Sequence, residues 1–105
     1  MRFTYVILQD EGVVELYIDQ GKGAEVRNKA IFDELCAQKD EIERDLSQAL
    51  EWQRLDQKRG CRIAKRFLVG GLKDKNSWPA LQDVMIDAMI GFEKVMRPRV
   101  ARLKV

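Results

Sequence analysis

Basic side chains gather in the second half of the sequence, where they could bind an anion. Five of them fall within residues 58–66, and others follow residue 96. Grouped lysines and arginines bind phosphates because they displace the counterions around a polyanion. Two of the basic residues in the hairpin point to one strand face and two to the other, so the sequence leaves open whether they form one surface. The candidates for polyanion binding are Arg59, Arg62, Lys65, Arg66, Arg99 and Arg102. The alternative is a solvated hairpin whose charges pair with acidic residues of the first helix.

A set of carboxylates near the N-terminus could hold a divalent metal ion. It comprises Asp10, Glu11, Glu15 and Asp19. Converging carboxylates beside a lysine can bind Mg²⁺ for cleavage of a phosphodiester. Glu15 and Asp19 share one strand face, but four residues of strand span about 13 Å, too far for one ion. The spacing therefore predicts ordinary outward charges, and a metal-dependent nuclease subunit is only a remote alternative.

Other catalytic groups are scarce. Histidine is absent from all 105 residues, which excludes a Ser-His-Asp triad, a Cys-His dyad and a histidine-containing zinc site within the chain. Cys36 and Cys61 lie in periodic segments, where a small buried apolar residue is expected. Gly21-Lys22-Gly23 lacks the spacing of a Walker loop or a dinucleotide fingerprint, and predicts a flexible connection. We therefore expect no catalytic residue, no metal site and no cofactor.

Hydrophobic periodicity predicts the elements that position these residues. Short alternating runs rich in β-branched residues are typical of strands, and apolar residues three to four apart are typical of helices. Gly pairs and polar runs separate the elements, and Arg97-Pro98 is expected to stop the last helix. The predicted elements are a hairpin over 2–19, a helix over 24–46, a hairpin over 50–69, a helix over 78–96 and a basic tail over 97–105.

One domain covers residues 1–105, because a chain of this length supports a single modest core. The order of elements is ββαββα. This order predicts an α+β fold in which a four-stranded antiparallel sheet carries two helices packed on one face.

Surplus apolar surface predicts self-association. Ile86 and Ile90 lie opposite the core-facing side of the last helix, four residues apart. On the first strand both faces are apolar, although a sheet covered on one side should have a polar outer face. A second copy of the chain is the simplest cover, since most oligomers are symmetric homo-oligomers. The predicted interface comprises Phe3, Tyr5, Ile7, Ile86 and Ile90.

Opposed charges are hidden in the near-neutral total of +2. Residues 1–57 carry a net charge of −6 and residues 58–105 a net charge of +8. Such asymmetry suits a nucleic acid or an acidic protein partner, and it can equally be neutralised between the two halves or between two subunits. No signal peptide and no apolar run long enough for a bilayer is evident, so we expect a cytoplasmic protein that makes no membrane contact.

Short motifs spread along the chain carry a family resemblance. They are Glu15-Leu16-Tyr17-Ile18, Asn28-Lys29, Phe32-Asp33 with Leu35, Lys39 with Ile42-Glu43, Leu50-Glu51-Trp52, Arg62-Ile63, Trp78 and the helix end at Arg97-Pro98. In these residues the chain resembles a bacterial and archaeal domain of unknown function, the family numbered 4268.

That resemblance implies a domain that usually forms the C-terminal part of longer proteins, some of them similar to restriction endonucleases. Short stand-alone versions resemble small proteins of mobile gene cassettes. Since the chain starts at the first hairpin, we expect the upstream region to be missing and apolar surface to be left bare. Together these observations predict an accessory interaction domain, acting as a homodimer without catalysis of its own. The alternative is a nucleic-acid-binding domain that uses the second hairpin and the tail.

Overall fold

Four strands form one antiparallel sheet in the order β1-β2-β4-β3. They are β1 (Arg2–Ile7), β2 (Gly12–Ile18), β3 (Glu51–Gln53) and β4 (Cys61–Phe67). β4 is the last strand in the sequence, yet it pairs with both β2 and β3, which leaves β1 and β3 at the edges. The predicted α+β fold with a four-stranded antiparallel sheet is confirmed. The computed structural model describes residues 1–68, 71, 73 and 75–103, so Val69 at the end of the predicted second hairpin lies outside it.

Three helices accompany the sheet: α1 (Glu25–Cys36), α2 (Lys39–Leu46) and α3 (Trp78–Ala101), the last preceded by a short 3-10 turn over Lys75–Ser77. The prediction of one helix over 24–46, and with it the ββαββα order with two helices, is wrong. The chain breaks at Ala37 and Gln38, where the Gln38 N–H donates to the Leu35 carbonyl at 2.9 Å. Neither break residue is Gly or Pro, and the apolar spacing continues in phase from α1 into α2. The periodicity therefore could not reveal the break.

The last helix continues beyond the predicted stop at Arg97-Pro98, so the tail does not begin at residue 97. Proline lacks an N–H and disfavours helix at the preceding residue. Arg99 holds the extra turn in place, because it pairs with Asp45 of α2 and donates to the Val95 carbonyl. This tertiary contact outweighs the local signal.

The second hairpin is shorter than the predicted 50–69. β3 ends at Gln53, because the next residue turns away from the sheet: the Arg54 guanidinium donates to both Asp33 carboxylate oxygens on α1. Leu55 then adopts a left-handed conformation with φ of 54°. A residue in that region cannot continue a strand.

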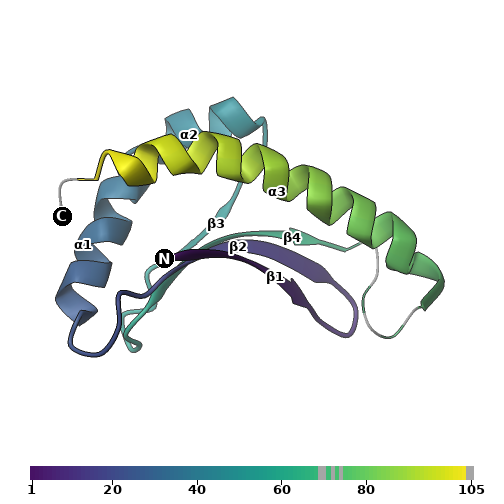
Figure 1. Cartoon of the computed structure of the whole chain (residues 1–105), viewed down its shortest axis with the longest axis horizontal. Coiled ribbons are helices and arrows are strands. Elements are labelled where there is room, and N and C mark those ends of the chain that lie inside the picture. Colours follow the sequence, from purple (N-terminus) through teal and green to yellow (C-terminus); the bar gives the residue numbers. More distant parts are fainter. Residues whose placement is uncertain (69–70, 72, 74, 104–105) are drawn as a thin grey trace.

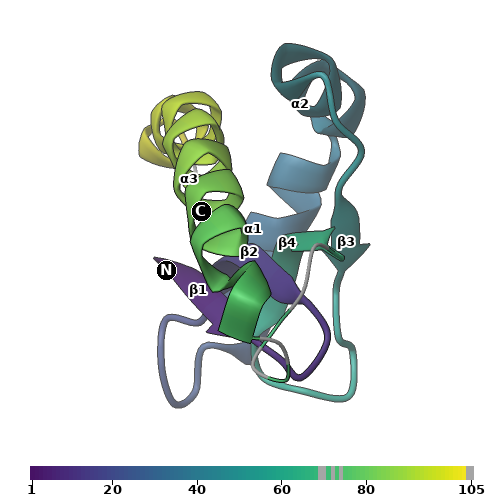
Figure 2. The same cartoon turned by 90° about the vertical axis from the view of Figure 1, so that its right-hand side faces the viewer.

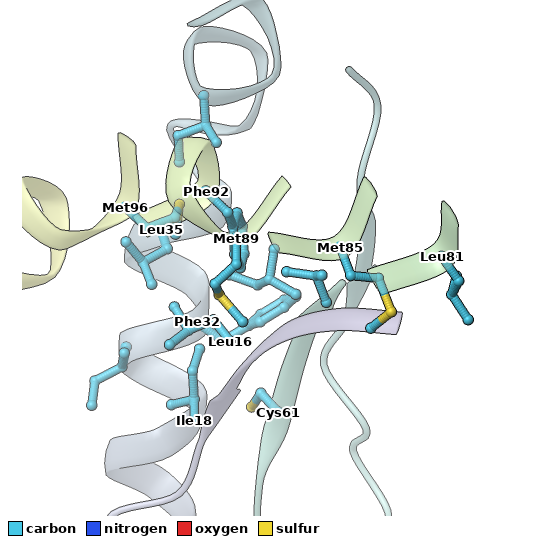
Figure 3. Packing of buried hydrophobic residues seen from close by; sticks show 14 residues of the cluster. Leu16, Ile18, Phe32, Leu35, Cys61, Leu81, Met85, Met89, Phe92 and Met96 are labelled. Carbon is cyan, nitrogen blue, oxygen red and sulfur yellow. The ribbon is translucent and has the colours of Figure 1, made fainter. Parts of the chain in front are cut away.

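All three helices lie on one side of the sheet (Figures 1 and 2). α3 runs along the strands above β1 and β2, while α1 and α2 stand beside it above the β3 side of the sheet. Alternate residues of β2 face the helices and enter the core with residues from α1, α2 and α3 (Figure 3). On α3 the buried side lies opposite Ile86 and Ile90, as predicted, and contains Leu81, Met85, Met89, Phe92 and Met96.

Candidate interaction surface at the β1 edge

A strip of exposed apolar side chains runs between β1 and α3. Tyr5 and Ile7 of β1 are 48% and 38% exposed, and Ile86 and Ile90 of α3 are 49% and 63% exposed. We call these four residues the apolar strip. A shallow hollow lined by Tyr5, Ile7, Gln82, Met85 and Ile86 joins the two elements, and Ile90 lies one turn further along α3. The structure thus brings together residues about eighty positions apart.

The strand register explains why these side chains are exposed. Tyr5 lies opposite Val14 and Ile7 opposite Gly12, so both face the helix side of the sheet. β1 is an edge strand of the described sheet, so Tyr5 and Ile7 have a neighbouring strand on one side only among the described residues. Gly12 leaves room for α3, because a Cβ there would lie 2.5 Å from the Met85 sulfur and would force that side chain to shift. Tyr5 and Ile7 therefore lie on the face that the helices cover. They are not the residues that would need cover on the helix-free face of the sheet.

Phe3 behaves differently from the rest of the predicted interface. Its ring packs edge-on against Phe92, with the ring centres 5.6 Å apart, and the Arg97 guanidinium lies 4.7 Å above the ring. Phe3 is half-buried and packs against the core. Phe3 therefore belongs to the contact between β1 and α3 rather than to the exposed strip.

The backbone of β1 also has an open side. The Leu8 N–H donates to the Glu11 carbonyl at 2.8 Å, which makes Leu8 and Glu11 a hydrogen-bonded pair. Because such pairs alternate along an antiparallel ladder, the N–H and C=O groups of Phe3, Tyr5 and Ile7 point away from β2. An edge of unpaired backbone groups is a template for another strand. Beside an exposed apolar strip, it forms a surface suited to a protein partner.

Three arginines of the predicted basic cluster pair with three of the four predicted carboxylates. Across β2 and β4, three arginines each meet a carboxylate, and the cluster pairs with the first hairpin rather than with the first helix. The pairs are Arg59 with Asp19 at 2.8 Å, Arg62 with Glu15 at 2.9 Å, and Arg66 with Glu11 at 2.5 Å and Glu51 at 2.6 Å. The hydrogen bond from Arg59, joined by one from the Gly21 N–H, lowers the pKa of the Asp19 carboxyl.

The remaining predicted polyanion contacts lie elsewhere. Lys65 is opposite Val14 and therefore on the helix side of β4, whereas Arg62 and Arg66 are on the other side. Arg99 is buried between Glu41 and Asp45 of α2, and Arg102 donates to the Pro98 carbonyl. The six residues do not share one face.

Two charges at the ends of the β1 hairpin have no such partner. Arg2 starts the strand, and Asp10 lies in the turn that follows it. Within the described part of the chain neither side chain forms a hydrogen bond or an ion pair.

One cluster of hydrogen bonds, around Lys29 of α1, was not predicted from the sequence. Lys29 Nζ donates to the carbonyls of Arg54, Leu55 and Gly60, at 2.6, 2.8 and 2.9 Å. The adjacent Asn28 accepts the Gln20 N–H and donates to the Arg59 carbonyl. Because these partners are mostly backbone groups, no residue type elsewhere signals the contacts. Only the family motif Asn28-Lys29 marked the position.

Other candidate sites have structural roles. Gly21 and Gly23 adopt φ of 109° and 84° in the turn before α1. Cys61 is fully buried, and burial raises the pKa of its thiol. Across the described residues no three potential metal-ligating side chains gather. In the same part of the chain, no helix is both long and apolar enough to cross a bilayer.

Comparison with known proteins agrees with the resemblance carried by the motifs. The family described as a domain of unknown function, DUF4268, matches residues 1–100. No curated protein and no solved structure gives a significant match. The match spans all four strands, α1, α2 and all of α3 but its last residue, so the chain belongs to the DUF4268 family.

Proposed function

We propose that this chain is an accessory protein-interaction domain that acts as a homodimer in the cytoplasm and performs no catalysis of its own. The observation that carries the proposal is the apolar strip beside the open edge of β1. Contiguous exposed apolar surface with a polar surround marks association sites. The carboxylates that could have served chemistry are instead held by arginines.

The family context supports an accessory role. The resemblance implies domains that usually end longer proteins, some similar to restriction endonucleases, as well as short versions on mobile gene cassettes. In the longer proteins, such a domain would supply assembly while another region supplies the chemistry. A second copy is the favoured occupant, because one chain carries both the apolar strip and an edge that can pair with itself.

Sedimentation velocity at tens of micromolar tests this proposal. We expect the wild-type chain to sediment as a dimer and the Ile86→Lys/Ile90→Lys double variant as a monomer, because two buried lysines at the interface lose hydration. Val26→Lys is the matched control: Val26 is 84% exposed on α1, so this variant should remain a dimer. A wild-type monomer at this concentration contradicts the proposal.

Nucleic-acid binding is the second candidate. Its support is the net charge of +8 in residues 58–105, with Lys65 and Lys58 free of ion pairs within the described residues. The ion pairs of Arg59, Arg62, Arg66 and Arg99 weigh against it, since a phosphate would have to displace a carboxylate from each. A gel shift at two salt concentrations decides the matter: binding that does not weaken with salt, or no binding, excludes this candidate.

A further inference from the structure

The outward backbone groups of β1 define how two copies can meet. Phe3, Tyr5 and Ile7 alternate along the strand, and each directs its N–H and C=O to the open side. Building on the proposed homodimer, we infer that β1 pairs with β1 of a second copy, antiparallel, with Tyr5 on the two-fold axis. The two sheets then form one continuous sheet.

This register is the one that uses the strand fully. Outward groups must lie opposite outward groups, so the axis must pass through a residue of β1 rather than between two residues. With the axis at Tyr5, Phe3 pairs with the partner's Ile7, Tyr5 with the partner's Tyr5, and Ile7 with the partner's Phe3. An axis at any other residue of β1 leaves at least one of the three outward residues opposite a position outside the strand.

Charge complementarity selects the same register. Antiparallel pairing about Tyr5 places Arg2 opposite the partner's Leu8 and two residues from the partner's Asp10. At about 3.3 Å per residue, that separation is within reach of an arginine side chain. Arg2 and Asp10 are the two charges of this hairpin that lack a partner within the described residues. In the dimer, Arg2 of each copy would therefore lie near Asp10 of the other copy, which gives two such pairs.

The position of α3 fits this arrangement. α3 lies over β1 and β2 (Figure 2), and strands are about 4.8 Å apart. Two α3 helices related by an axis at the β1 edge are therefore roughly 10–14 Å apart, close to helix-packing distance. The interval between them is lined by Ile86 and Ile90 from each copy, so edge pairing covers the apolar strip as well.

Disulfide trapping tests the register. In a Cys36→Ser background, with the fully buried Cys61 retained, Tyr5→Cys should form a covalent dimer under mild oxidation. Paired Cα atoms on the axis are about 5.5 Å apart, which suits a disulfide. Thr4→Cys alone is the matched control and should not cross-link, because its own copies are offset by two residues. A mixture of Thr4→Cys and Val6→Cys chains should cross-link, since these two positions lie opposite each other.

A charge exchange provides an independent readout that needs no cysteine. Arg2→Glu should raise the dimer dissociation constant roughly two- to tenfold at low salt, and Arg2→Glu/Asp10→Arg should restore it. Covalent dimer at Tyr5→Cys together with this rescue supports the register. A reduced Tyr5→Cys chain that sediments as a dimer yet does not cross-link, or an unrescued exchange, overturns the register and leaves the proposed homodimer standing. A wild-type monomer removes both.

Discussion

Lys29 illustrates how one charged side chain can fix a distant loop. All three of its ammonium protons are used on carbonyls between β3 and β4. One of those carbonyls belongs to Leu55, whose left-handed conformation is uncommon for a residue with a side chain. The cation thus holds the loop in a shape that the loop sequence alone does not favour.

Replacing Lys29 by Met should lower the free energy of unfolding by about 2 kcal/mol, because three carbonyls lose a charged donor. Urea denaturation measures the change. Lys58→Met is the control: Lys58 is exposed in the same loop, and its loss should cost under about 0.5 kcal/mol. Equal effects of the two substitutions would contradict the assigned role of Lys29.

The residues of the apolar strip differ from Lys29 in how far sequence could identify them. Helical phase alone predicted that Ile86 and Ile90 are exposed, and strand alternation placed Tyr5 and Ile7 together. The Lys29 contacts could not be predicted, because its acceptors are backbone groups 25 to 31 residues away. The pattern of side chains along a sequence therefore indicates which face of a helix or strand is exposed, but it says very little about which backbone groups a side chain will bind.

The ends of the helices were harder to predict from the sequence than the helices themselves. The break between α1 and α2 lacks a Gly or Pro, and α3 passes through Pro98. In both cases tertiary contacts outweigh local preference: α2 is anchored by Glu43, which accepts the Leu50 N–H and the Trp52 indole N–H, and α3 by Arg99. The strands, by contrast, were located within one or two residues where alternation was regular, as in β2.

Gly91 lies inside α3, where glycine costs stability. Apart from Gly91 itself, its two chain neighbours and the nearby backbone of its own helix, no described atom lies within 4 Å of the position that a Cβ would occupy there. Gly91→Ala should therefore raise the free energy of unfolding by about 0.5–1 kcal/mol, since alanine favours helix and restricts the unfolded chain. Gly12→Ala is the contrasting variant and should destabilise, because its Cβ would meet Met85. Parallel urea titrations compare the two, and a destabilising Gly91→Ala would contradict the helix at that position.

At the scale of the whole molecule, the opposed charges of the two halves meet inside the fold. Carboxylates from residues 1–57 pair with arginines from residues 58–105 across β2, β4 and β3, and again between α2 and α3. The sequence revealed the asymmetry and left its use open. The strand order explains how the opposed charges are used, because the basic strand β4 lies between β2 and β3, which both carry carboxylates.

A homodimer makes thermal stability depend on protein concentration. A hundredfold rise in concentration should raise the wild-type melting temperature by roughly 5 °C, because association stabilises the folded state by mass action. The melting temperature of the Ile86→Lys/Ile90→Lys variant should not change over the same range of protein concentration. Calorimetry over that range provides the measurement, and a wild-type melting temperature independent of concentration would speak against self-association.

The central place of β4 has a consequence for synthesis on the ribosome. β3 is made before β4, yet β4 is the strand with which it pairs. While the chain emerges at about 5–20 residues per second, the β1–β2 hairpin is the part of the described sheet that can pair before residue 61 appears, and the area of its core face that α3 covers stays bare until α3 follows. We therefore expect the four-stranded sheet and its core to be completed only after α3 has emerged, so that the open edge of β1 stays exposed while neighbouring nascent copies are close.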